Sequence, residues 1–169
     1  EMFRNGWRST TETYGYDLVQ LTHYAVRSAE SFLVKRDRGR VNHVDRDQGL
    51  AYWFRMNNNF EEDLSIQTRL PLMREELARL LADPEIRAAH DSAVAAHRDK
   101  IDALRATGNY AGFYADLTGD RLEKLSRLHM HFGSNVFLSG PEVVPDEVLR
   151  KDPNEDWFFT VELSGDTAH

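Results

Sequence analysis

Residues 83–108 constrain the fold more than any other stretch, because the start, the period and the stop of one helix agree there. Asp83 is a common helix N-cap, Pro84 is tolerated at the first helical position, and Gly108 favours a stop. The sequence therefore predicts one long helix. Six of its residues recur at helical spacing and are expected to face the core: Ile86, His90, Ala93, His97, Ile101 and Leu104.

Helical periodicity continues on both sides of this segment. Apolar residues repeat at helical spacing over 14–36, 47–66, 71–81 and 120–132, and an aromatic stretch at 109–117 predicts a short helical link. Gly39 marks the end of the first of these helices, and Pro71 marks the start of the third. We expect a mainly α protein, a helical bundle of about four to five helices.

The character of the sequence changes after Gly133. Residues 135–138 and 157–163 are short β-prone runs separated by glycine and proline, which predicts a small C-terminal hairpin or extended segment. Three regions are expected: an N-terminal docking arm (1–13) whose aromatic residues pack on the domain or on a partner, a helical domain (14–133) and an acidic C-terminal segment (134–169).

Composition excludes several classes of function. The 169 residues include no cysteine, so disulfides, thiolate zinc sites and cysteine nucleophiles are ruled out, and a cytoplasmic location fits. The net charge is −7, and no basic field is available for nucleic-acid binding. No apolar run approaches the roughly 20 residues of a membrane span, and the first residues lack a secretion signal pattern. We therefore expect neither nucleic acid nor membrane as a partner.

The candidate site is a polar cluster between helices. Asn57 and Glu61 lie one turn apart on the stripe of the predicted helix 47–66, while His90, His97 and His129 lie on the stripes of two others. Glu61 would act as base or ligand, and the three histidines as acid, base or ligand. A carboxylate with two imidazoles is also a common ligand set for a divalent metal, for which the candidates are Glu61, His97 and His129.

Helix geometry limits this hypothesis. His90 and His97 are about 10 Å apart along a helix, so a single ion cannot easily bind both. The Glu-x-x-His pattern of di-iron bundles is absent. The structural alternative is that each histidine is neutral, buried and hydrogen-bonded, and that Asn57 and Glu61 belong to an interhelical network. A second alternative is that Asn57, Asn58 and Asn59 form a turn, which would remove Glu61 from the cluster.

Other patterns are weaker. His129 and His131 are two residues apart, so on a helix His131 should face water rather than share a metal. His43 and Asp45 could form a base and its orienting partner in a loop. The mixed-charge stretch 35–47 fits a solvated connector better than an anion site.

Two functions remain open. The first is a helical auxiliary subunit or interaction protein that docks on a larger enzyme assembly or self-associates. The second is a small helical enzyme or ligand-binding protein with a Glu/His site, whose numerous aromatic residues could line a pocket for an apolar or aromatic small molecule. No nucleotide-binding or serine hydrolase motif is present, so the sequence names no cofactor.

Overall fold

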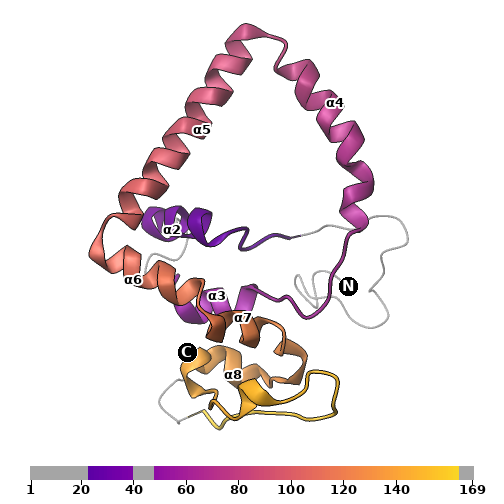
Figure 1. Ribbon diagram of the computed structural model, residues 1–169, viewed down its shortest axis with the longest axis vertical. Coiled ribbons are helices and arrows are strands. Elements are labelled where there is room, and N and C mark those ends of the chain that lie inside the picture. Colours follow the sequence, from indigo (N-terminus) through magenta and orange to yellow (C-terminus); the bar gives the residue numbers. More distant parts are fainter. Residues whose placement is uncertain (1–22, 40–47, 164–169) are drawn as a thin grey trace, which may run out of the picture.

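The computed structural model describes residues 23–39 and 48–163 of the chain. Within these ranges the protein is mainly helical, as the sequence predicts (Figure 1). Short 3-10 turns (η) connect several of the α-helices. The elements are α2 (Ala29–Arg38), α3 (Leu50–Met56), η1 (Ser65–Arg69), α4 (Leu70–Leu80), α5 (Pro84–Arg105), α6 (Gly108–Leu117), α7 (Asp120–Ser126), η2 (His129–His131), α8 (Ser134–Ser139), η3 (Pro141–Val143) and η4 (Val148–Arg150).

The hydrophobic core is built where α2, α3, α6, α7 and α8 meet. Phe32 and Leu33 enter it from α2, Phe54 from α3, Leu125 from α7 and Val136 from α8, and each is almost fully buried. Because α2 and α3 precede α4 and α5 in the chain while α6 to α8 follow them, the core joins two separate parts of the sequence.

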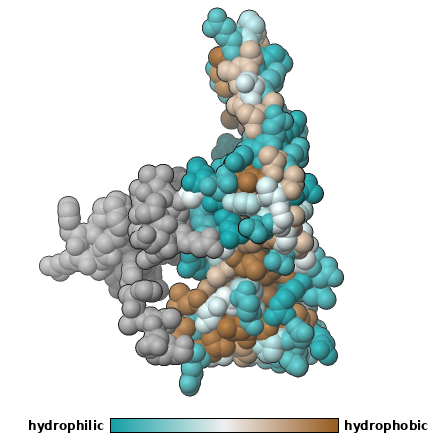
Figure 2. Space-filling view, turned by 90° about the vertical axis from the view of Figure 1, so that its left-hand side faces the viewer, coloured by the Kyte–Doolittle hydropathy of each residue, from teal (hydrophilic) through white to brown (hydrophobic). Residues whose placement is uncertain are grey.

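Helices α4 and α5 extend away from this core. Figure 1 shows them as two sides of a triangle, with α2 at its base beside the lower end of α5, and Figure 2 shows them as a narrow projection above the body. We call α4 and residues 84–96 of α5 the arm. The C-terminal half of α5 holds the arm to the body, since Lys100 Nζ forms an ion pair with Asp37 Oδ2 of α2 at 2.7 Å and Leu104 is buried in the core.

The predicted start of the long helix is confirmed, but its predicted stop at Gly108 and its predicted burial are wrong, because Gly108 is the first residue of α6. The Asp83 side chain accepts hydrogen bonds from the backbone N–H groups of Glu85 and Ile86, as an N-cap does, and the helix ends at Arg105. Leu104 is its one buried residue, and Ile86 is 44% exposed. Periodicity locates an apolar stripe but does not require that the same chain covers it.

The predicted helix 14–36 starts too early in the sequence. Residues 23–28 are not helical, and α2 begins at Ala29 because the Ser28 side chain accepts a hydrogen bond from the N–H of Ser31. Gly39 ends the helix with φ +73°, as expected for a C-terminal glycine. The described ranges do not include residues 14–22 of this predicted helix or the predicted N-terminal docking arm, residues 1–13. They also do not include His43, Asp45 and the last six residues.

The predicted helix 47–66 is also wrong, because α3 ends at Met56. The alternative, a turn at the three asparagines, is confirmed. Asn58 Oδ1 accepts a hydrogen bond from the N–H of Phe60, while the N–H and side chain of Asn59 both bind Ser126 on α7. Asparagine side chains compete with helical hydrogen bonds in this way. Glu61 consequently leaves the predicted stripe.

The predicted C-terminal hairpin is not found among the described residues. Residues 135–138 belong to helix α8, and the second run contributes one isolated parallel bridge, between Phe132 and Phe159. The extended chain packs closely there, since the Gly133 N–H donates to the Phe159 carbonyl at 2.9 Å and Asn135 Nδ2 donates to the Val161 carbonyl. The helix predicted over 120–132 likewise ends at Ser126, and η2 follows it.

Candidate functional site

The structure places the predicted site residues in separate surroundings. Glu61 is exposed in the loop between α3 and η1, where it lines a cavity of about 690 Å³ beside Glu62, Asp63 and Arg127. Asn57 caps the end of α3 and accepts a hydrogen bond from Asn59 Nδ2. These two residues therefore do not share a helix face.

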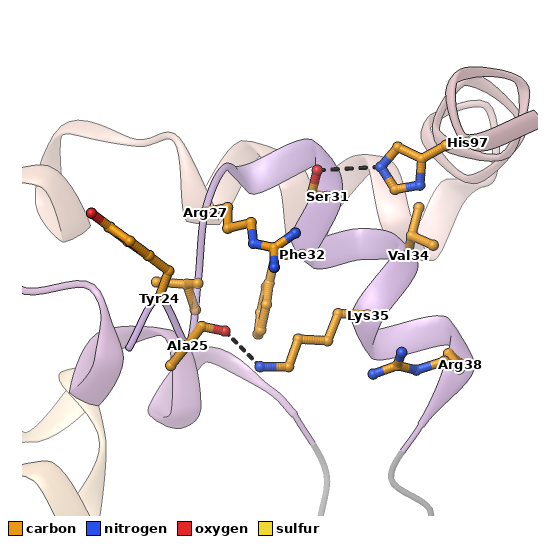
Figure 3. Close-up of a pocket in the computed structure, with 10 residues that line it drawn as sticks. Tyr24, Ala25, Arg27, Ser31, Phe32, Val34, Lys35, Arg38 and His97 are labelled. Carbon is orange, nitrogen blue, oxygen red and sulfur yellow. Dashed lines mark hydrogen bonds between the residues drawn. The ribbon is translucent and has the colours of Figure 1, made fainter. Parts of the chain in front are cut away.

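The histidines of α5 lie at different distances from the body. His90 is exposed on the arm. His97, two helical turns further on, reaches α2, where its Nε2 lies 3.3 Å from Ser31 Oγ in a hydrogen bond (Figure 3). It lines a different cavity from the one that contains Glu61.

His129 lies in the aromatic part of the core. Its ring packs edge-on against Phe54 and Phe137, with centroids 5.4 and 4.9 Å away, and its Nε2 has no hydrogen-bond partner among the described residues. Burial lowers the pKa of this imidazole to about 4, so the ring is neutral at pH 7. Among the described residues there is no group of three or more histidine, aspartate or glutamate side chains that could hold a metal ion.

His131 was predicted to face water, and the structure corrects this. Because α7 ends at Ser126, helical spacing no longer applies, and both His129 and His131 are buried. His131 Nδ1 and Nε2 lie 3.0 Å from the carbonyl oxygens of Trp157 and Pro153, respectively, and its ring stacks on that of Trp157 at 4.0 Å. This histidine therefore joins the C-terminal segment to the core.

The cavity that contains His97 lies between α2 and the extended residues that precede it. Its volume is about 380 Å³, and we call it the α2 pocket (Figure 3). The Lys35 ammonium donates to the Ala25 carbonyl at 2.6 Å and to the Tyr52 hydroxyl at 3.0 Å, which holds residues 24–27 beside the helix. Arg27 and Arg38 complete the basic part of its lining.

The charged residues of α2 lie on two sides of the helix. Its acidic residues meet α5 and α6: Asp37 pairs with Lys100, and Glu30 accepts a 2.6 Å hydrogen bond from the Tyr114 hydroxyl, which lowers the pKa of that carboxyl. Among its basic residues, Arg36 also lies on the α6 side, 3.9 Å from the centroid of the Phe113 ring, while Lys35 and Arg38 line the α2 pocket. Positions 31, 35 and 38 follow helical spacing within α2, a signal in the sequence that could have identified the part of the pocket that this helix contributes.

A second candidate site is the apolar surface of the arm. No residue of α4 is buried. Met73, Leu77 and Leu80 recur on one face of this helix and are 49%, 39% and 38% exposed; we call these three residues the α4 stripe. Leu72 on the adjacent face is 63% exposed. Large apolar side chains in a continuous exposed row are typical of protein interaction surfaces.

No family model, no curated protein and no solved structure matches this chain. None of the helices in the described part of the chain is both long enough and apolar enough to cross a membrane.

Proposed function

We propose that this chain is an interaction protein that self-associates through its arm, and that it acts in the cytoplasm, where its lack of cysteine would suit the reducing conditions. The observation that carries the proposal is the exposed α4 stripe on a helix with no buried residue. The sequence also left open that the protein docks on a larger enzyme assembly, and such docking would use the same surface.

The short helix α4 depends on a partner for its stability. This helix has 11 residues, and isolated helices shorter than about 12–15 residues are marginal in water. Helices of this length are normally stabilised by burial of an apolar face against a partner. Burying one leucine or methionine side chain contributes about 1.5–3 kcal/mol. The α4 stripe offers three such side chains that the described part of the chain does not cover.

Charge favours a second copy of the chain as the partner. Helix α4 carries two arginines and two glutamates, so it presents no strong field of either sign. A helix with balanced charges can pair with its own copy in an antiparallel arrangement, because each sign meets the other. In a two-fold dimer, the arm of each copy would cover the same surface of the other, and association would stop at two chains.

Light scattering during gel filtration tests the proposal. We expect the wild-type protein to have twice the 19.5 kDa mass of the chain. Leu77→Glu should convert it to a monomer, because it places a charge at the centre of the α4 stripe, and dimer affinity should fall by at least about a hundredfold. Circular dichroism should still report a folded protein, since no core residue is changed.

Ala78→Glu is the matched control. It introduces the same side chain at the next position of α4, which points about 100° away from Leu77. The control should keep the dimer. A wild-type protein that remains a monomer at every concentration would overturn the proposal, as would equal effects of the two substitutions.

A further inference from the structure

The α2 pocket combines cationic side chains in a protein whose net charge is −7. Arg27, Lys35, Arg38 and His97 line it, and none of its described lining residues is a carboxylate. Figure 3 shows Arg27 and Arg38 extending toward one another from the two ends of the pocket, with Lys35 between them. Like charges gathered without a counter-charge are unfavourable unless solvent or an anion compensates them.

The guanidinium groups of the two arginines are not engaged by any described residue. Neither Arg27 nor Arg38 forms an ion pair or a hydrogen bond within the described part of the chain, whereas Arg79 on the arm makes two hydrogen bonds with Glu76 and Arg121 on α7 binds Asp146. Lys35 differs from both, because its ammonium is held by Ala25 and Tyr52 and adds positive charge from a fixed position. Because the Lys35 side chain is already held in place, little conformational freedom is lost when a ligand binds beside it.

We propose that the α2 pocket binds the phosphate group of a small phosphomonoester. Each guanidinium can donate two parallel hydrogen bonds to phosphate oxygens, a geometry that arginine recognises better than lysine does. The Ser31 hydroxyl and the His97 imidazole lie on the same wall, where their mutual hydrogen bond of 3.3 Å is long enough to be exchanged for bonds to a ligand.

The remaining lining suits the organic part of such a ligand. Tyr24 borders the pocket with a ring that is 53% exposed, and Val34 adds an apolar side chain. A volume of about 380 Å³ is within the range of small-molecule sites. The pocket therefore has a charged part for the phosphate and an apolar edge for the group esterified to it.

Calorimetric titration with three probes tests this proposal: inorganic phosphate, phenyl phosphate and phenol. We expect both phosphates to bind, phenyl phosphate the more tightly, and phenol not to bind measurably. If inorganic phosphate binds as tightly as phenyl phosphate, free phosphate is the ligand and the monoester assignment is wrong. If neither phosphate binds, the whole proposal is overturned.

Two variants locate the binding. Arg27→Gln and Arg38→Gln should each weaken phenyl phosphate binding by roughly tenfold to a hundredfold, because each removes a charge-assisted contact. The matched control, Arg79→Gln, removes an arginine from the arm and should bind phenyl phosphate as the wild type does. Equal weakening in all three variants would show a general charge effect and contradict a site at the α2 pocket.

Discussion

His129 shows how strongly one buried side chain can couple stability to pH. Its ring lies between Phe54 and Phe137, and its Nε2 has no hydrogen-bond partner in residues 23–39 and 48–163, so protonation inside the folded protein is unfavourable. The pKa is lowered from 6.5 to about 4 by burial. The unfolded chain, in which the ring is solvated, takes up a proton at a higher pH than the native protein.

This difference in proton uptake makes the stability of the fold depend on pH. The free energy of unfolding should decrease as the pH falls from about 6.5 to about 4, and His129 should account for about 3 kcal/mol of the decrease. His129→Leu should remove this component, so that its unfolding free energy depends less steeply on pH. Urea denaturation at a fixed protein concentration, at neutral pH and near pH 4, measures the two slopes.

His90→Gln is the control for this experiment, because His90 is exposed on the arm. It should keep the wild-type slope. Parallel curves for the wild type and His129→Leu would mean that His129 is protonated in the folded protein over this pH range.

Gly133 is required for a close approach between segments. A Cβ atom at this position would lie 2.9 Å from the Cβ of Thr160 and 3.1 Å from Cζ of Phe158. Gly133→Ala should therefore separate the C-terminal segment from η2 and α8, and should destabilise the protein by about 1–3 kcal/mol. Thermal or urea denaturation measures this loss.

Gly112 provides the matched comparison for Gly133. It lies within α6, and a Cβ atom there would meet nothing within 4 Å. Gly112→Ala should stabilise the protein by about 0.5–1 kcal/mol, because alanine has the higher helix propensity. Destabilisation by both substitutions to the same degree would argue against a close contact specific to Gly133.

At the scale of elements, α4 and α5 obtain their stability from different sources. The C-terminal half of α5 is held by the contacts of Lys100 and Leu104 with the body. Helix α4 has no buried residue, and the Arg79–Glu76 pair on its surface is exposed, so this pair contributes little. We therefore expect the stability of α4, unlike that of α7, to depend on association.

Hydrogen exchange tests this difference between helices. In the wild-type protein, the amides of α4 should become more protected as the protein concentration rises, since dimerisation would bury the α4 stripe. In Leu77→Glu they should exchange rapidly at every concentration, while those of α7, which contributes the fully buried Leu125, stay protected. Slow exchange throughout α4 in that variant would contradict the prediction.

At the scale of the whole molecule, the sequence predicted where helices start and end better than it predicted how they pack together. The N-cap of α5, the proline at the start of α4 and the glycine after α2 are explained by the conformations of single residues, and the sequence contains all three of these signals. The mainly helical fold class follows from periodicity in the same way. These predictions required no knowledge of which elements pack together.

The candidate site could not be predicted in this way. The spacing of Glu61, His97 and His129 placed them on apolar stripes, but convergence depends on helix lengths and on the path of the chain between helices. Three asparagines ended α3, and the arm carried His90 away from the body. The catalytic role that we assigned to these residues stays a prediction. The α2 pocket was missed because Arg27 precedes its helix and no local rule connects it with His97.

The arm also divides the core residues into two sets, one before it and one after it in the sequence. Ala29, Phe32, Leu33, Trp53 and Phe54 enter the core before the chain reaches the arm, and the other buried apolar residues enter after it returns. Residues 81–83, at the tip, connect these two sets while contributing nothing to the core themselves. Opening the peptide chain at this point would therefore yield two complementary fragments, each incomplete alone, whose reassembly would be driven by the core.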